Sequence, residues 1–177
     1  MTVASWFSKM TGSGRLDNLE DLLLAQIKDL YSAEDQLISA LPKMAAAAHS
    51  SQLKSAFSTH LQETKQHKQR LEEVFRLLGK EPEAETCEAM QGLVAEGGEV
   101  IDMEGDPEVK DAALIAAAQR VEHYEIAGYG CVRAFAHRLG HTQVVYQLQQ
   151  TLDEEAHADK LLTEIAEGFI NAQAARS

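Results

Sequence analysis

The sequence predicts an all-α fold: an antiparallel bundle of four long helices, with one long crossover connection that carries a short extra helix. Apolar residues recur three and four residues apart over four long stretches, which is the spacing of one helix face. Two of the three connections between these stretches are short, and the connection over residues 80–106 is long. Short connections make neighbouring helices antiparallel, and the long one lets the third helix begin at the same end of the bundle as the second.

The first helical hairpin is predicted over about residues 17–47 and 51–78. Asp17 is expected to cap the first helix, with Glu20 at the position of a capping box. The second helix should end at Gly79, because glycine adopts the left-handed conformation that commonly follows a helix. These two helices are joined by a short turn, so they are expected to lie side by side and antiparallel.

The crossover is predicted to hold a shorter helix within residues 86–104. Asp106 and Pro107 form an N-cap followed by proline at the first helical position, so the third long helix should run over about residues 107–139. The fourth is expected from about residue 142 to between residues 169 and 171. Four long helices with a single crossover are typical of ferritin-like bundles.

The composition bounds the domain organisation and the partners. The chain has 177 residues and a net charge of −12, which argues against binding to a nucleic-acid backbone or to an anionic membrane. We expect an N-terminal tail over residues 1–16, the bundle over residues 17–171 and a C-terminal tail over residues 172–177. Because we find neither a membrane-spanning stretch nor a cleavable leader, we expect a cytoplasmic protein.

The functional signal is a set of acidic and imidazole side chains on the predicted inward faces of the four long helices. A buried carboxylate without a partner is costly, and several together repel one another. Two divalent cations would remove this conflict, because carboxylates can bridge two metals and each imidazole can complete one coordination sphere. No catalytic residue beyond the metal ligands is predicted. The candidate ligands are Glu34, His60, Glu63, His67, Glu122, Glu125, Glu154 and His157.

The spacing of these acids supports a shared site. Glu63 follows Glu34 by 29 residues, and Glu154 follows Glu125 by the same interval. Each helical hairpin therefore places two carboxylates at a comparable level. Hard oxygen ligands with one or two imidazoles suit iron first and manganese second, rather than a zinc–thiolate site. The predicted cofactor is accordingly a pair of divalent ions.

Each part of the signal also has an ordinary explanation. A Glu154-x-x-His157 pair is more often a solvated pair on a helix surface than a set of ligands. Glu122 and Glu125 alone would usually form an exposed acidic face, and His60 could be a hydrogen-bonded histidine at a helix interface. The conjunction favours metal, because four helices each supply an inward acid in a suitable topology.

Several short segments together match a known family. They are Leu30-Tyr31-Ser32-Ala33-Glu34, Leu41-Pro42-Lys43-Met44, His60-Leu61-Gln62-Glu63-Thr64, Arg70-Leu71-Glu72, Cys87-Glu88-Ala89-Met90, Gly92-Leu93, Val121-Glu122-His123-Tyr124-Glu125 and Glu154-Glu155-x-His157-Ala158-Asp159. In combination they resemble the YciF-type ferritin-like stress proteins of bacteria, over roughly residues 19–168. The resemblance implies a ferritin-like fold, a homodimer and a stress-linked role.

The resemblance also implies roles for particular residues. By the wider ferritin-like pattern, Glu34 would be the ligand from the first long helix and Glu63 the bridging ligand from the second. The pair Glu122-x-x-Glu125 is similar to the third helix of rubrerythrin-like proteins, and Glu154-x-x-His157 fits the motif of the fourth helix.

The second helix departs from that pattern. The usual histidine would lie three residues after Glu63, where this chain has Gln66. His67 comes one residue later and His60 lies one turn earlier, so either can replace the missing ligand. The choice between them stays open at the level of the sequence.

Three functions fit these observations. The first is a dinuclear metal protein that reacts with oxygen or hydrogen peroxide, with electrons from a partner or a small reductant because the chain has no glycine-rich nucleotide loop. The second is a metal-binding protein without turnover. The third is a metal-free structural or interaction bundle.

Overall fold

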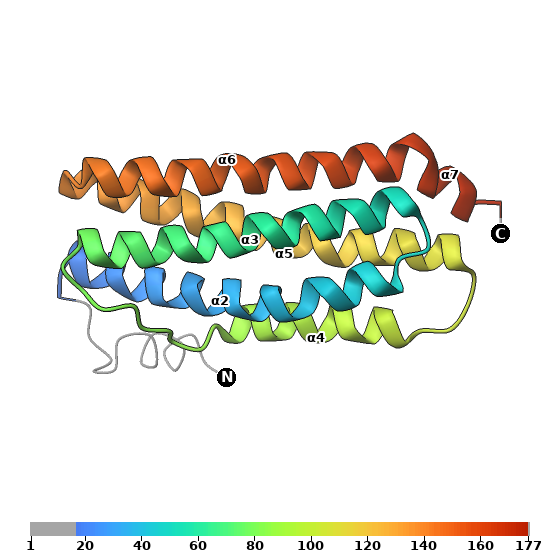
Figure 1. Cartoon of the computed structure of the whole chain (residues 1–177), viewed down its shortest axis with the longest axis horizontal. Helices are drawn as coiled ribbons and strands as arrows, with labels where there is room; N and C mark the ends of the chain where they lie inside the picture. The colour runs from blue at the N-terminus through green and yellow to red at the C-terminus, as the bar shows by residue number, and fades with distance from the viewer. Residues whose placement is uncertain (1–16, 177) are drawn as a thin grey trace.

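The computed structural model describes residues 17–176 and is all-helical over that range. Its main helices, in chain order, are α2 (Leu19–Ala47), α3 (Ser51–Leu77), α4 (Glu88–Asp102), α5 (Pro107–Leu139) and α6 (Thr142–Ile165). A short π-helix, η1 (Ala166–Ile170), and α7 (Asn171–Ala174) extend α6 (Figure 1). Helical structure thus reaches into the stretch expected to be a C-terminal tail, and the expected N-terminal tail, residues 1–16, lies outside the described residues.

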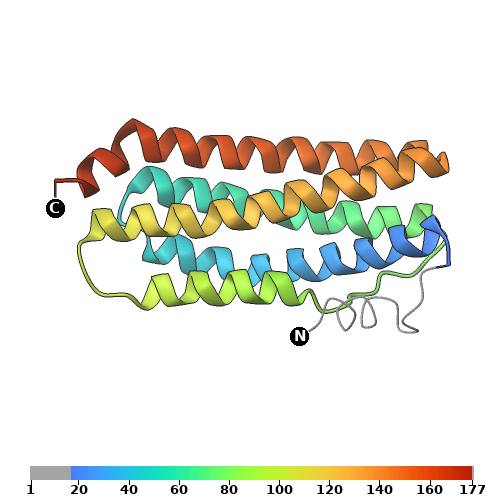
Figure 2. The ribbon, with the colours of Figure 1, turned by 180° about the vertical axis from the view of Figure 1, so that it is seen from behind.

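The helices form an antiparallel bundle with one long crossover, as predicted. Helices α2, α3, α5 and α6 run along the bundle, and α4 lies along its outside (Figures 1 and 2). Helix α4 packs on α2 and α5, whereas α3 packs on α2 and α6. The crossover between α3 and α5 therefore covers one face of the bundle with a fifth helix. None of the helices in residues 17–176 is both long and apolar enough to cross a membrane.

The helix ends follow local capping chemistry. Asn18, not Asp17, is the N-cap of α2, and its side chain accepts a hydrogen bond from the backbone N–H of Asp21 at 2.9 Å. The cap thus lies one residue later than predicted, because asparagine is as good a cap as aspartate. Asp106 caps α5 as predicted. Gly140 ends α5 with a φ of 83°, in the left-handed region that favours glycine.

Helix α4 is attached through Cys87, its N-cap residue. The Cys87 backbone N–H donates to Ser32 Oγ at 3.1 Å, and its thiol lies 3.0 Å from the hydroxyl of Tyr124. Tyr124 in turn donates to Asp29 Oδ2 at 2.5 Å. Burial raises the pKa of the Cys87 thiol to about 11, so this cysteine stays protonated and serves as a packing and capping residue.

The core has two apolar parts with a polar layer between them. One part is built around Leu23, Leu71 and Phe75, and the other around Leu53 and Leu114. The acidic and imidazole side chains of the sequence signal occupy the layer between these parts. Apolar packing on both sides holds that layer in place and keeps bulk water away from it.

Candidate metal centre

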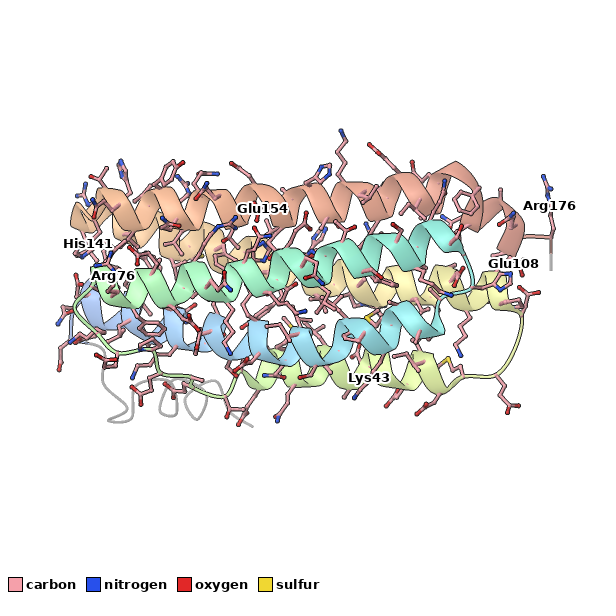
Figure 3. All side chains as sticks on the ribbon, viewed as in Figure 1. Lys43, Arg76, Glu108, His141, Glu154 and Arg176 are labelled. Atoms are coloured by element: carbon pink, nitrogen blue, oxygen red, sulfur yellow. The ribbon has the colours of Figure 1, made fainter. Side chains whose placement is uncertain are left out.

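Six buried ionisable side chains form the polar layer, and all four long helices contribute. Each is at most 6% exposed. Figure 3 shows Glu154, the chain neighbour of one of the six, about midway along α6. The six are Glu34 from α2, His60 and His67 from α3, Glu122 and Glu125 from α5, and Glu155 from α6.

The six side chains fall into two groups that share one glutamate. In the first group, His60, Glu122, Glu125 and Glu155 offer ligand atoms that all lie within 4.8 Å of one another. In the second group, Glu34, His67 and Glu155 do the same. Glu155 is therefore the residue placed to bridge two cations, and each group has one imidazole of its own.

Contacts across the shared glutamate define the centre. His60 Nε2 lies 3.4 Å from Glu122 Oε2 and 3.6 Å from Glu155 Oε2. On the other side, His67 Nδ1 lies 2.8 Å from Glu155 Oε1 and 3.6 Å from Glu34 Oε1. The two carboxylate oxygens of Glu155 thus each lie near a different imidazole.

Each imidazole is fixed from outside by a further carboxylate. His60 Nδ1 lies 3.3 Å from Glu63 Oε2, and His67 Nε2 lies 2.9 Å from Glu154 Oε2. Arg70 holds Glu154 with two hydrogen bonds, of 2.6 and 2.8 Å. In a neutral imidazole, a proton on the outer ring nitrogen would be donated to this carboxylate, and the inner nitrogen would then present its lone pair to the centre. This is the arrangement that supports histidine ligands in metal sites.

The inward atoms make no hydrogen bond of good geometry, although His67 Nδ1 lies 2.8 Å from Glu155 Oε1. Within residues 17–176, the buried side-chain nitrogen and oxygen atoms without a hydrogen bond all belong to these six side chains, apart from Nε of Arg133. They include both oxygens of Glu125 and of Glu155, and the inner nitrogens of His60 and His67. A buried polar atom left unsatisfied costs about 1–3 kcal/mol, so this concentration calls for a ligand.

The donor set fits two divalent cations. Four ionised carboxylates carry four negative charges, which two dications neutralise, and two neutral imidazoles complete the set. Oxygen and imidazole donors of this kind suit iron or manganese. The Tyr129 hydroxyl also donates a hydrogen bond to Glu34 Oε1, which helps to orient that carboxylate.

Burial and mutual contacts shift the pKa values of all six side chains. Burial raises the pKa values of three glutamates, which are Glu34, Glu122 and Glu125. Burial opposes charging of the imidazoles, but the carboxylates around them prevail and raise the pKa of His60 to about 9 and that of His67 to about 11. Burial acts on Glu155 as well, but these two imidazoles outweigh it and lower its pKa.

The structure brings together five of the eight candidate ligands. These are Glu34, His60, His67, Glu122 and Glu125. Both histidines of α3 take part, because seven residues are two helical turns and place them on one face. The open choice between His60 and His67 is thereby replaced by one imidazole in each group.

The other three candidates lie outside the cluster. Glu63 and Glu154 are partly exposed and contact the outer ring nitrogens, and His157 is exposed. On α6 the predicted helix phase is wrong. Its buried face runs through Thr151, Glu155 and Leu162, whereas Glu154 and His157 were predicted to point inward.

Two residues of the centre were missed in the sequence. Glu155 could have been found by extending the spacing of Val144, Leu148 and Thr151, the buried residues at the start of α6. Arg70 carries no such signal, because its contact with Glu154 joins α3 to α6 and depends on the packed bundle.

Comparison with known proteins places the chain in a family. The profile of the family described as Domain of unknown function (DUF892) matches residues 18–175. Protein YciF from Escherichia coli (strain K12) is 41% identical over 160 residues, which make up 90% of this chain and 96% of YciF. This relative confirms the family resemblance that the sequence motifs predicted.

Solved structures agree with this assignment. The crystal structure of the E. coli stress protein YciF has a TM-score of 0.85 at 41% identity and covers 88% of this chain and 99% of that chain. YcfI from Rhodopseudomonas palustris has a TM-score of 0.81 at 43% identity, covering 83% and 94%. A protein from Xanthomonas campestris pv. campestris shares the fold, with a TM-score of 0.71 at 20% identity over 90% and 98%. From the profile, the sequence identity and the common fold, we conclude that this chain belongs to the YciF-type (DUF892) family.

Proposed function

We propose that the chain binds two divalent metal ions, iron or manganese, in the polar layer and reacts there with oxygen or hydrogen peroxide. His60, Glu122 and Glu125 would hold one ion and Glu34 and His67 the other, and Glu155 is common to both groups. The observation that carries this proposal is the set of unpartnered inward atoms on all six side chains. The outer nitrogens of both imidazoles are meanwhile occupied by other carboxylates.

Two adjacent cations would supply Lewis-acid and redox chemistry toward a small oxidant. The protein itself positions the ligand side chains and excludes bulk water. Glu63 and Glu154 hold the two imidazoles, and Tyr129 holds Glu34. The apolar core on either side keeps bulk water out, which strengthens every charge interaction within the layer.

A role in stress response is part of this proposal. The relative from E. coli is called a stress protein, and consumption of an oxidant would be a direct contribution to such a role. We further propose a cytoplasmic homodimer that receives electrons from a partner protein or a small reductant. Neither nucleic acid nor membrane is a proposed partner, because the chain carries a net charge of −12.

Metal quantification tests the proposal. Protein purified without chelator and loaded with ferrous or manganous ion is expected to hold two ions per chain, and the loaded form should consume peroxide faster than the metal-free form. Glu125→Ala should lower the metal content, whereas Glu108→Ala, on the first turn of the same helix, should not. A wild-type chain without bound metal after loading would refute the metal centre.

The second candidate is a metal-free structural bundle. It is favoured by the 2.8 Å contact of His67 with Glu155, since protonated imidazoles can balance part of the acid charge. YcfI, the relative from R. palustris, is itself proposed to be a structural protein. In this case Glu125→Leu should stabilise the protein under all conditions, because it removes two unpartnered buried oxygens. For a metal centre, the same change stabilises the metal-free form and lowers the metal content.

A further inference from the structure

A narrow slot between α3 and α6 leads from the surface to one side of the centre. Its volume is about 50 Å³. Thr59 and His157 lie at its exposed end, and the buried His60 and Glu122 lie at its inner end. The unpartnered atoms His60 Nε2 and Glu122 Oε2 belong to these two inner residues. The slot thus joins solvent to the His60 side of the polar layer.

The walls of the slot are mostly apolar. They are formed by Ala56 and Phe57 from α3 and by Ala158, Leu161 and Leu162 from α6. The small side chains of the two alanines leave the gap between the helices. One water needs roughly 10–15 Å³ of such space, so the slot admits molecules of a few heavy atoms and excludes larger ones.

Within residues 17–176, the other sides of the centre are covered by packed helices, with an apolar cavity of about 120 Å³ between α2, α4 and α5. Helix α4 covers the face formed by α2 and α5, away from α6 (Figures 1 and 2). On the His67 side, Arg70 and Glu154 bridge α3 and α6, and Tyr129 is fully buried next to Glu34. The slot therefore gives the two halves of the centre unequal access from solvent.

We infer that the slot is the access path by which a small uncharged oxidant reaches the His60 side of the centre. This inference rests on the proposed function. An uncharged molecule of two heavy atoms crosses apolar walls at little desolvation cost, whereas a dication would lose most of its hydration there at a large cost. Glu63, at the rim, already contacts His60 Nδ1, so it is engaged in holding the imidazole. Metal uptake is therefore not expected to depend on the slot.

Xenon tests the slot without any metal, because apolar cavities bind it. Crystals of the metal-free protein under xenon pressure are expected to show density between α3 and α6 in the wild type and none there in Ala158→Leu. A larger apolar cavity of about 120 Å³ between α2, α4 and α5 is the internal control. Xenon in that cavity but not in the slot of the wild type would overturn the inference.

Ligand-binding rates test the path to the centre. For ferrous-loaded protein, the rate of nitric oxide binding, followed by absorbance, should fall about tenfold or more in Ala158→Leu, as expected when a barrier is added to the path. The rate of cobalt uptake by the metal-free protein should change far less. Gly97→Leu is the matched control, because it fills the other cavity, where an added Cβ has no atom within 4 Å.

A second blocking variant keeps the test valid if Ala158→Leu fails to fold. Leu161→Trp narrows the same slot at a partly buried position and should reproduce the effect of Ala158→Leu on nitric oxide binding. Equal slowing of cobalt uptake and nitric oxide binding would show that the slot carries cations, which contradicts the inference. If the wild type binds no metal, the proposed function fails, while the xenon experiment still decides whether the slot admits small apolar species.

Discussion

The two imidazoles of the centre do the same task with different support. His67 is held by Glu154, which Arg70 clamps with two hydrogen bonds, and the whole set ties α3 to α6. His60 is held by Glu63 alone, from the same helix, at 3.3 Å. In the clamped half the imidazole of His67 is fully buried, and the loosely supported half faces the slot. The contacts thus make the His67 half of the centre rigid and leave the His60 half accessible through the slot.

The largest effect is expected where the two halves meet. Glu155→Ala removes the carboxylate common to both groups of ligands, so the metal content of loaded protein should fall from two ions per chain to near zero. Elemental analysis after gel filtration measures this. Asp153→Ala, an exposed acid two residues away on α6, is the control and should retain both ions. Retention of both ions by Glu155→Ala would remove the shared ligand from the account.

Loss of one imidazole should separate the halves. His60→Ala and His67→Ala each remove the only histidine of one group, so each variant should keep about one ion per chain. The double variant should keep almost none. Titration with cobalt, followed by its visible absorbance, distinguishes the sites because each imidazole contributes to one of them. If either single variant lost both ions, the two positions would not be separable.

Loss of an outer carboxylate, Glu154 or Glu63, should weaken metal affinity less than loss of a ligand, and the two losses should differ in size. Glu154→Gln should weaken the affinity of one position by about 10-fold to 100-fold, the usual effect of a residue that supports a histidine ligand. Glu63→Gln should have a smaller effect, because its contact with the imidazole is longer, at 3.3 Å against 2.9 Å, and Glu154 is also held by Arg70. Competition with a chelator gives both affinities, and Glu73→Gln, an exposed acid paired with Arg76, is the control. A larger effect at Glu63 would reverse the comparison.

The smallest effect is a pH dependence of the metal-free protein. Folding raises the pKa of His60 to about 9 and that of His67 to about 11. A raised pKa stabilises the fold below the ordinary value of 6.5 and this stabilisation is lost as the pH rises through the raised value. The raised pKa values of Glu122 and Glu125 likewise stabilise the fold at low pH, and this stabilisation is also lost as the pH rises. The lowered pKa of Glu155 does not change the stability above neutral pH.

Chemical unfolding at about pH 6 and about pH 9 checks this dependence. The metal-free protein should be less stable at the higher pH. The loaded protein should lose little, since cations have replaced the protons. A metal-free protein with equal stability at both values would show that the imidazoles are not charged in the folded chain.

The fold could be predicted because its signals are local. The three- and four-residue spacing and the Asp106 cap each act within a few residues, and the structure confirms both. Even the error at the first cap, Asn18 for Asp17, is a shift between two neighbouring residues of similar capping strength.

The site was predicted only where helix phase was unambiguous. Glu34 and Glu125 are flanked by apolar residues at regular spacing, so their inward direction follows from the sequence. On α6, the adjacent Leu161 and Leu162 allow two phases, and only the spacing of Val144, Leu148 and Thr151 at the start of the helix favours Glu155 over Glu154. The clamp of Arg70 on Glu154 joins residues 84 positions apart, and no local pattern encodes such a pair.

Anomalous diffraction from crystals of the metal-loaded protein tests the central claim most directly. Data collected on both sides of the iron or manganese absorption edge should show two peaks per chain in the polar layer, one beside His60 and one beside His67, with Glu155 between them. The contradicting result is a loaded crystal with no anomalous peak in this layer and with the imidazoles of α3 still paired to the carboxylates of α2, α5 and α6.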